Sequence, residues 1–398
     1  MEFAKIGKGK KMTKTNRERI SAMLHYQDFD RVPIMHFGFW DETIEKWGKE
    51  GHLTDEEVKN AIKLGGNQAD GNEYELAIAK KLGFDDNIFV YTGQKGNWYD
   101  MPLYPAFEEK VVEHYPDGSM KLLDSDGVFV VKKEGARSIP SEVGHTVFDR
   151  KSWEEHYLPR LQWTAKRLDM DEINKFIEEN DTRERHMAVY CGSLFGKLRN
   201  YWGLVEISYL QVDDPDLFGE CIDAIGKLCY EVTKHTLETG VKVDYAHFWE
   251  DICFNKGPLI NPEVFRKYVA KHYRKITDEC AKYGIDIVSV DCDGYIDDLV
   301  PIWLDNGVNT MFPIEYGAWE YDFGTMRKKF GKQLRGLGNM NKNVLSKSKK
   351  EVDAEVERAK RLVDLGGFVP CFDHRIAPDA DWDLTKYYCE QMKKAFWK

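Results

Sequence analysis

The sequence predicts an α/β fold, specifically a (β/α)8 TIM barrel with an inserted β-hairpin excursion. Short apolar runs alternate with helical stretches along most of the 398 residues, a pattern typical of parallel strands covered by helices. There are about eight such runs, the number of strands that closes a barrel. Polar side chains follow directly after several of these runs, as expected where the carboxyl ends of barrel strands carry a functional site.

The expected barrel strands are short apolar segments bounded by Gly, Pro or polar residues. They span residues 32–37, 88–90, 186–190, 243–247, 285–290, 310–313, 333–337 and 367–370. Helices are expected between them. Thr15 followed by Glu18 forms a capping box that predicts a helix to about residue 26, and further helices are expected at 41–49, 55–64 and 74–82.

One segment departs from this alternation. Residues 110–114, 120–123 and 128–132 have a period of two and are separated by Pro-Asp-Gly and Ser-Asp-Gly, which predicts antiparallel hairpins. We therefore expect a β insertion at about 105–135 within a single catalytic domain of residues 16–398. Residues 1–15 are expected to be a disordered, lysine-rich extension.

Composition limits the classes of partner. A net charge of -11 and a pI near 5.6 argue against binding to nucleic acid or an anionic membrane, because both require a basic face. The apolar runs are too short for a membrane span, and no secretory apolar core begins the chain, so a cytoplasmic protein is expected. The eight cysteines are dispersed without a CxxC pair, as expected for reduced thiols.

The candidate site is a set of acidic and imidazole side chains placed just after predicted strands. The expected metal donors are Glu250, Asp291, Asp293 and His374. Carboxylate and imidazole are ordinary ligands of a divalent metal, so a metal site is the leading interpretation. Other roles stay open: helix caps for Asp291 and Asp293, a buried ion pair for Glu250, and a histidine that only orients a ligand for His374.

Aromatic residues alternate with these positions and predict a pocket for a flat ring. His36, Trp40, Trp249 and Tyr316 are expected to face the barrel mouth and to contact a planar ligand. Packing in the core is the alternative for each of them. No phosphate-binding loop is present, because neither glycine-rich segment has the required spacing.

Several ordered motifs resemble the uroporphyrinogen decarboxylase superfamily, and the resemblance covers nearly the whole chain from Asn16 onward. The motifs are Asn16-Arg17-Glu18-Arg19, Asp30-Arg31-Val32-Pro33, Glu250-Asp251, Asp291-Cys292-Asp293-Gly294, Pro313-Ile314-Glu315 and Asp373-His374-Arg375-Ile376-Ala377-Pro378-Asp379. The decarboxylases carry an arginine-rich segment after the first strand, whereas this chain has Met35-His36-Phe37-Gly38-Phe39-Trp40 there. A porphyrin substrate is therefore disfavoured.

The other branch of the superfamily exchanges methyl groups with a corrinoid protein, and the resemblance implies a zinc-type site built from strand ends. Members that methylate a thiol use a His-x-Cys pair and a late Cys; Asp291, Asp293 and His374 stand at these positions here. Oxygen and nitrogen donors form a harder site, suited to polarising an ether or phenolate oxygen. The resemblance thus implies zinc, or another divalent metal, in a corrinoid-dependent O-demethylase.

The leading hypothesis is a methyltransferase component that moves a methyl group from a methoxylated aromatic compound to the Co(I) corrinoid of a separate protein. The chain has no Asp-x-His-x-x-Gly motif, so the corrinoid is expected on a partner. Glu315, Asp251 and His247 are the candidate acids for the leaving oxygen, with Glu315 preferred. The alternatives are a decarboxylase of a cyclic acid, which would need Arg31, Arg335 or Arg375 as its carboxylate grip, and a corrinoid-binding module. Oligomeric state is open, with a homodimer as one option.

Overall fold

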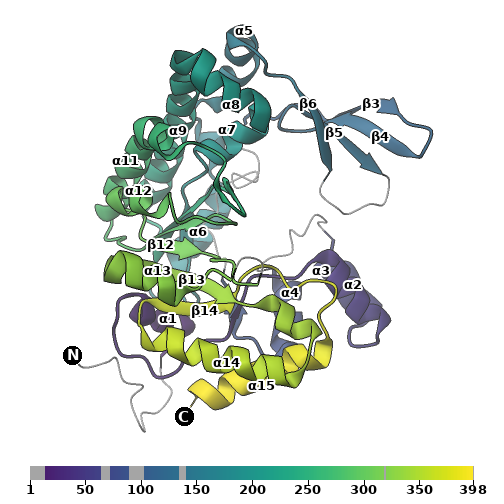
Figure 1. The fold of residues 1–398 in the computed structure, drawn as a ribbon, viewed down its shortest axis with the longest axis vertical. Coiled ribbons are helices and arrows are strands. Elements are labelled where there is room, and N and C mark those ends of the chain that lie inside the picture. The colour runs from purple at the N-terminus through teal and green to yellow at the C-terminus, as the bar shows by residue number, and fades with distance from the viewer. Residues whose placement is uncertain (1–13, 64–71, 89–102, 134–139, 318–319, 398) are drawn as a thin grey trace.

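A computed structural model describes residues 14–63, 72–88, 103–133, 140–317 and 320–397. Parallel strands occupy the centre and helices cover the outside (Figure 1). The central strands are β1 (Met35–His36), β2 (Asp86–Asn87), β7 (Ala188–Tyr190), β8 (Tyr245–Trp249), β11 (Val288–Asp291), β12 (Thr310–Phe312), β13 (Arg335–Met340) and β14 (Phe368–Phe372). Their order along the chain confirms the predicted barrel class.

Neighbouring strands pair in parallel. β1 pairs with β2, and β7, β8, β11, β12, β13 and β14 form one sheet in that order. A parallel bridge between Phe39 and Ile376 joins the segments that follow β1 and β14. On the other side, the Ile88 carbonyl after β2 lies 2.7 Å from His186 Nε2 and 3.0 Å from the Tyr245 hydroxyl. These contacts bring the two sheets together around a common interior.

Seven of the predicted strands overlap observed ones but differ at their ends, whereas the predicted strand at 88–90 does not overlap β2, which ends at Asn87. The runs at 243–247 and 285–290 become β8 and β11, each of which starts later and continues to Trp249 and Asp291. Residues 89–90 of the run at 88–90 lie outside the described residues. The shift occurs because strand ends depend on backbone pairing with neighbours, which apolar composition does not specify.

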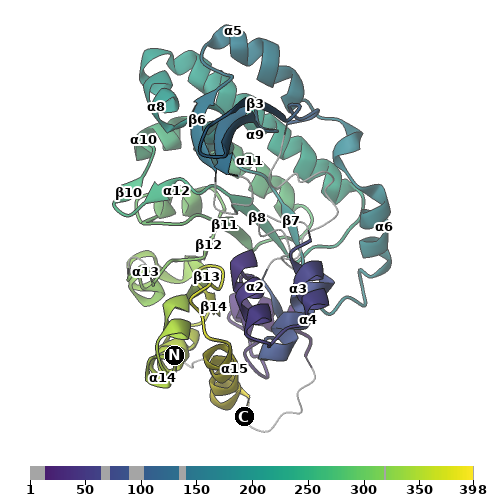
Figure 2. The same cartoon turned by 90° about the vertical axis from the view of Figure 1, so that its right-hand side faces the viewer.

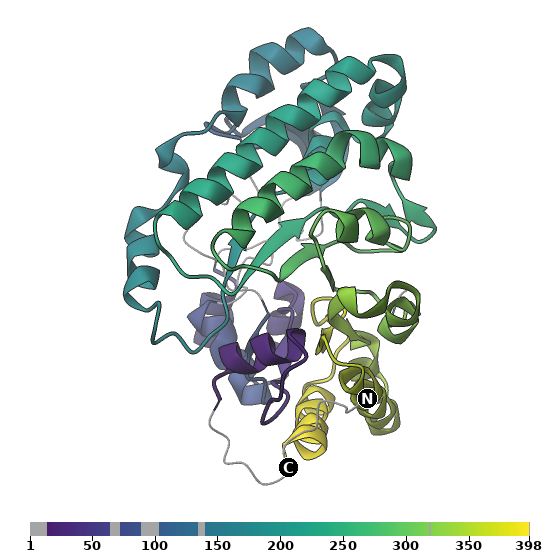
Figure 3. The ribbon, with the colours of Figure 1, turned by 90° about the vertical axis from the view of Figure 1, so that its left-hand side faces the viewer.

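The helices follow the strands. They are α1 (Asn16–Leu24), α2 (Asp41–Lys49), α3 (Asp55–Ala61), α4 (Glu73–Leu82), α5 (Arg150–Ser152), α6 (Met170–Glu178), α7 (Phe195–Trp202), α8 (Leu204–Asp213), α9 (Pro215–Glu238), α10 (Pro262–Val264), α11 (Ala270–Ala281), α12 (Val300–Asp305), α13 (Phe323–Phe330), α14 (Lys349–Asp364) and α15 (Trp382–Phe396). Thr15 and Glu18 form the expected capping box of α1. The long helices α9 and α11 lie side by side on the outside of the barrel (Figure 3).

A separate antiparallel sheet projects from the barrel beside α8 (Figure 1). It consists of β3 (Lys110–His114), β4 (Ser119–Leu123), β5 (Val128–Lys133) and β6 (Ser141–His145), paired in that order. The predicted insertion ended at about residue 135, whereas β6 extends the sheet to His145. β6 was missed because its sequence, Ser-Glu-Val-Gly-His, has too few apolar residues to suggest a strand. None of the described helices is long and apolar enough to cross a membrane.

Candidate functional site at the barrel mouth

The carboxyl end of β11 places two aspartates at the centre of the barrel mouth. Ser289 points into the interior, where its hydroxyl lies 2.7 Å from His247 Nδ1. Because side chains alternate along a strand, Asp291 faces the same way and lies at the mouth. The loop after β11 then presents Asp293.

Carboxylates from two neighbouring strands meet at this loop. The backbone amide of Asp293 donates to Asp251 Oδ1 at 3.0 Å, and the next amide, that of Gly294, donates to Glu315 Oε2 at 2.8 Å. Asp251 has a left-handed backbone with φ of 53°, which is uncommon outside glycine and turns its side chain toward the loop. Asp251, Asp291, Asp293 and Glu315 therefore form one acidic cluster.

This crowding changes the protonation of the two central aspartates. Burial, followed by the nearby Asp251 carboxylate, raises the pKa of Asp291 well above its usual range. Burial also raises the pKa of Asp293 well above its usual range, and Asp251 and Asp291 add to the effect. Neither aspartate forms an ion pair with a lysine or arginine among the described residues. The geometry therefore favours protonated carboxyl groups at the mouth.

One wall of the mouth is aromatic. Trp40 stacks on His374 with ring centroids 5.6 Å apart and planes 10° from parallel. Phe37 lies next to both His374 and Phe312, with centroid separations of 5.5 and 4.7 Å. The structure thus brings the predicted pocket residue Trp40 together with the predicted metal donor His374.

The orientation of His374 defines which ring nitrogen faces the acids. Its Nδ1 accepts a hydrogen bond from the Arg375 backbone amide at 2.8 Å, so the neutral ring carries its proton on Nε2. Nε2 lies 3.8 Å from Asp293 Oδ2. Burial lowers the pKa of His374 to about 3, with further lowering by Lys342 and Arg375. His374 is therefore neutral near pH 7 and directs an N–H toward Asp293.

Two cations border the acidic cluster. Burial lowers the pKa of Lys342, and the charges of Asp373, Glu315 and Asp293 oppose this shift. Arg375 lies over the Phe37 ring, 5.6 Å from the ring centroid. The positive charge of Arg375 lowers the pKa of Asp291 and so offsets part of the rise that burial causes. Lys342 follows β13, and its charge gains a role only through its position beside these carboxylates.

Asp373 has a structural task in the same region. Its Oδ2 accepts from the amides of Tyr316 at 3.0 Å and Gly317 at 2.5 Å, and its Oδ1 accepts from the amide of Lys342 at 3.2 Å. Burial raises the pKa of Asp373 to about 6. Asp373 therefore joins the loops after β12 and β13 and holds them at the mouth.

The donor chemistry at the mouth suits a divalent ion, but the donors do not converge as predicted. Asp293 Oδ1 is buried without a hydrogen-bond partner, which is consistent with a missing ligand. Within the described ranges, however, no group of three or more His, Cys, Asp or Glu side chains is placed to hold a metal ion. The predicted set of Glu250, Asp291, Asp293 and His374 does not fit a metal as it stands.

Glu250 is the predicted donor that lies apart from the rest. Its carboxylate accepts from the amides of Leu194, Phe195 and Gly196 at 2.7–3.0 Å and from the Tyr273 hydroxyl at 2.5 Å. These groups hold Glu250 at the amino terminus of α7, where a carboxylate stabilises the helix dipole. The sequence suggested a buried ion pair as the alternative to a metal ligand; the structure shows a buried helix cap.

Two predicted histidines also lie away from the acidic cluster. His247 sits in the barrel interior against Ser289, and burial lowers its pKa to about 3, so it is a weak candidate for a proton donor. His36 packs between Phe39 and Phe84, with Nδ1 3.2 Å from Glu75 Oε1 of α4. Its side chain thus points to the helix layer, because the alternation along β1 turns Phe37 into the mouth instead.

The remaining aromatic predictions, Trp249 and Tyr316, are half-buried. Trp249 is the last residue of β8, at the mouth, where the Lys197 ammonium lies 5.6 Å from its ring centroid. The Tyr316 ring is covered by the Arg358 guanidinium at 3.8 Å. Phe312, which sequence reasoning did not single out, lines the mouth between Phe37 and His247. Its position at the carboxyl end of a predicted strand was the feature of the sequence that could have identified it as a residue of the mouth.

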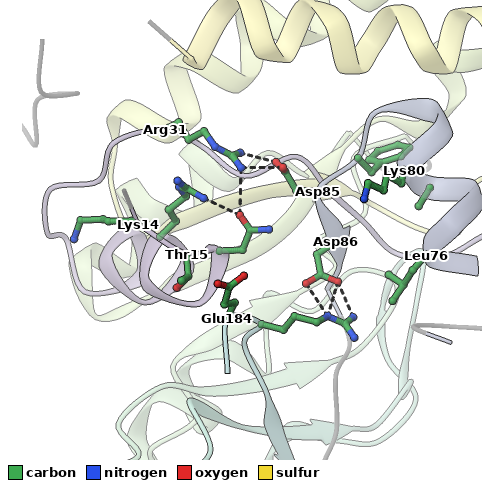
Figure 4. A pocket seen from close by; sticks show the side chains of 13 residues that line it. Lys14, Thr15, Arg31, Leu76, Lys80, Asp85, Asp86 and Glu184 are labelled. Carbon is green, nitrogen blue, oxygen red and sulfur yellow. Dashed lines mark hydrogen bonds and ion pairs between the residues drawn. The ribbon is translucent and has the colours of Figure 1, made fainter. Parts of the chain in front are cut away.

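A cavity of about 500 Å³ lies at the opposite end of the barrel, by the amino termini of β1 and β2 (Figure 4). Its arginines are already paired: Arg31 with Asp85 at 2.6 Å and Arg185 with Asp86 at 2.6 Å. Residues at this end of a barrel serve stability rather than chemistry. The candidate functional site is therefore the mouth and not this cavity.

Comparisons with known proteins agree with this architecture. Residues 203–395 match the family model of uroporphyrinogen decarboxylase (URO-D). The structure is similar to that of a methyltransferase from Methanosarcina mazei, with a TM-score of 0.58 and 14% identity over 96% of this chain and 99% of that one. The family match confirms the resemblance to the uroporphyrinogen decarboxylase superfamily over residues 203–395, and the similar solved structure supports the fold.

Two further structures are similar at lower scores. They are a putative vitamin-B12-independent methionine synthase from Listeria monocytogenes and a B12-independent methionine synthase from Shewanella sp. W3-18-1 in complex with selenomethionine. Each is 11% identical; they cover 91% and 92% of this chain and 96% and 98% of their own, with TM-scores of 0.38 and 0.43. These scores are too low to establish a shared fold. No curated protein matches the chain.

Proposed function

We propose that this protein is the methyltransferase component of a corrinoid-dependent O-demethylase. It transfers a methyl group from a methoxylated aromatic compound to the Co(I) corrinoid of a separate protein. The observation that carries the proposal is the juxtaposition of buried, protonation-prone carboxyl groups with a flat aromatic wall at the mouth. The similarity to a methyltransferase fold supports the reaction class.

The chemistry requires neutralisation of the leaving oxygen. An aryl methyl ether releases its methyl group to a nucleophile only if the phenolate that forms is protonated or otherwise stabilised. A protonated Asp293 supplies that proton, and the carboxylate that remains is stabilised by Lys342 and by His374 Nε2–H. Asp251 orients the loop through its bond to the Asp293 amide.

This assignment changes the preferred acid. Glu315 was the expected proton donor, but it accepts a hydrogen bond from the Gly294 amide and thereby positions the loop. Burial and neighbouring carboxylates favour the protonated form of Asp291 and Asp293 instead. Glu315 and Asp251 become positioning residues in the proposal, and Trp40 and Phe37 are the surfaces on which a ring would stack.

The zinc prediction needs an experiment of its own, because the described side chains do not form a complete set of metal ligands. Metal content should be measured on the purified protein and on a His374→Ala variant. One ion per chain that is lost from the variant would show that a third donor moves toward Asp293 and His374. A protein that is active without metal would leave the carboxyl groups as the source of activation.

The decarboxylase alternative finds less support. Arg31 is paired with Asp85, and Arg335 donates to the Leu24 carbonyl at 2.8 Å; both lie at the amino-terminal end of the barrel. Among the three expected grip residues, only Arg375 lies at the mouth. A substrate with several carboxylates would also be repelled by the acidic cluster.

The decisive experiment follows methylcobalamin formation from methoxyarenes and Co(I) cobalamin. We expect Asp293→Asn to lower the transfer rate by about 100-fold or more, because general acid catalysis typically contributes that much. Asp379→Asn is the control, since Asp379 is an exposed carboxylate on the loop after β14. Absence of methylcobalamin with the native protein, or release of CO2 from a cyclic acid, would contradict the proposed function.

A further inference from the structure

Helix α8 has apolar side chains on both of its faces. Ile207 and Leu210 are buried against the protein, whereas Val205, Tyr209 and Val212 are 63%, 62% and 75% exposed. The spacing of four and three residues places these exposed side chains in one stripe along the helix. Exposed apolar side chains that gather in one stripe, opposite the buried face of the helix, form a surface suited to being covered by a partner.

The stripe is widened by the chain segment that leads out of the β3–β6 sheet. A Cβ atom on Gly203, just before α8, would lie 2.4 Å from His145 Nε2, so His145 packs directly against this end of the helix. At the other end Arg150 lies 3.7 Å from Asp214. The segment between them therefore runs along α8 and presents Phe148, which is 72% exposed.

The flank of the stripe is acidic. Glu206 and Asp213 are seven residues apart, hence on the same side of the helix, and both are exposed. A second copy packed antiparallel about a two-fold axis would place this acidic flank beside itself, which is repulsive. A partner with an apolar surface bordered by basic residues is complementary to it.

The stripe lies close enough to the barrel mouth for a protein bound on it to reach the mouth. A short loop joins the carboxyl end of β7 to α7, and only Gly203 separates α7 from α8. Figure 2 shows α8 next to β6, to one side of the central strands. A protein seated on this face would have the barrel mouth within its reach.

We propose that the surface formed by Phe148, Val205, Tyr209 and Val212, with its acidic flank of Glu206 and Asp213, is the docking site of the protein that carries the corrinoid. The inference rests on the proposed function, because it takes the partner from there. Apolar contact supplies affinity, and the acidic flank selects a partner with a basic border.

The test compares two methyl acceptors, the corrinoid protein in its Co(I) state and free Co(I) cobalamin. In a Val205→Ser/Val212→Ser variant we expect the KM for the corrinoid protein to rise about 10-fold or more, as for loss of interface anchors. The rate with free cobalamin should not change. Glu206→Lys/Asp213→Lys, which alters only exposed charges, should also raise this KM and reduce its dependence on salt.

Tyr283→Ser and Leu365→Ser are matched controls, because both remove an exposed apolar side chain elsewhere on the surface. An unchanged KM in both α8 variants would overturn the docking proposal. So would a dimer of the native protein that dissociates in the Val205→Ser/Val212→Ser variant, which would assign the surface to a second copy.

Failure of the proposed function gives a different result, namely no methyl transfer from methoxyarenes to either acceptor. Binding of the corrinoid protein, measured by sedimentation velocity, then still decides the docking site. Weaker binding in the α8 variants but not in the control variants would support the docking site. Binding of equal strength in the native protein, the α8 variants and the controls would overturn it.

Discussion

At the amino-terminal end of the barrel buried carboxylates face arginines, whereas at the mouth Asp291 and Asp293 face other carboxylates. The amino-terminal pairs have nitrogen–oxygen distances of 2.6–2.9 Å: Arg19–Asp30, Arg31–Asp85, Arg185–Asp86 and Arg183–Asp244. At the mouth, burial and mutual repulsion instead raise the pKa of Asp291 and Asp293. Both ends bury acidic groups, but among the described residues only those at the amino-terminal end form direct ion pairs with arginines.

The two ends of the barrel therefore serve different purposes, stability at the amino-terminal end and chemistry at the mouth. Paired groups at the amino-terminal end keep the strands in place and leave no reactive atom available. The crowded acids at the mouth reduce stability, yet they provide carboxyl groups that favour the protonated form beside an aromatic surface. Such a cost at an active site is a common compromise between stability and activity.

Removal of an arginine from the amino-terminal end should give the largest loss of stability. Arg31→Ala leaves the largely buried Asp85 without its partner, so the free energy of unfolding should fall by about 3–5 kcal/mol. Lys81→Ala removes the partner of the more exposed Glu57 and should cost at most about 1 kcal/mol. Denaturant unfolding measures both. Equal losses would show that the buried pairs have no special role in stability.

The pH dependence of stability should have opposite signs at the two ends. Folding raises the pKa of Asp291 above its value in the unfolded chain. The contribution of Asp291 to stability is therefore fully present below the unfolded pKa, and it is lost as pH rises through the folded pKa. Although burial opposes it, the hydrogen bond from Arg19 lowers the pKa of Asp30, whose contribution is instead lost as pH falls.

Asp291→Asn should therefore stabilise the protein at pH 8 by about 1–2 kcal/mol and have little effect near pH 4. Urea titrations at both pH values provide the measurement. A variant that is destabilised at pH 8 would indicate that the ionised Asp291 is compensated after all, and the contrast between the two ends would not hold.

The smallest expected effect concerns the aromatic wall. Trp40→Leu should raise the KM for a methoxyarene about 10-fold, because it removes one stacking surface, and should change the melting temperature little. Trp397→Leu is the comparison at the amino-terminal side, where the ring contacts Arg31 at 4.1 Å. If Trp40→Leu lowered stability and left KM unchanged, Trp40 would be a packing residue.

Much of the architecture follows from the sequence alone. The alternation of apolar runs and helical stretches determined the barrel class, and Thr15 with Glu18 determined the first helix cap. These features are set by interactions between residues close in the chain, so they are visible without a structure. The positions of Asp251, Asp291, Asp293, Glu315 and His374 after strands were also evident, because parallel strands bring their carboxyl ends together.

Tertiary structure decided which of these side chains act together. Glu250 and Asp251 are adjacent in sequence, yet Glu250 caps α7 while the left-handed backbone of Asp251 turns its carboxylate toward Asp293. His36 and Phe37 differ in the same way, with Phe37 at the mouth and His36 in the helix layer. The direction of a side chain depends on strand register and on loop geometry, both of which are set by contacts between distant segments. Local sequence carries no record of those contacts.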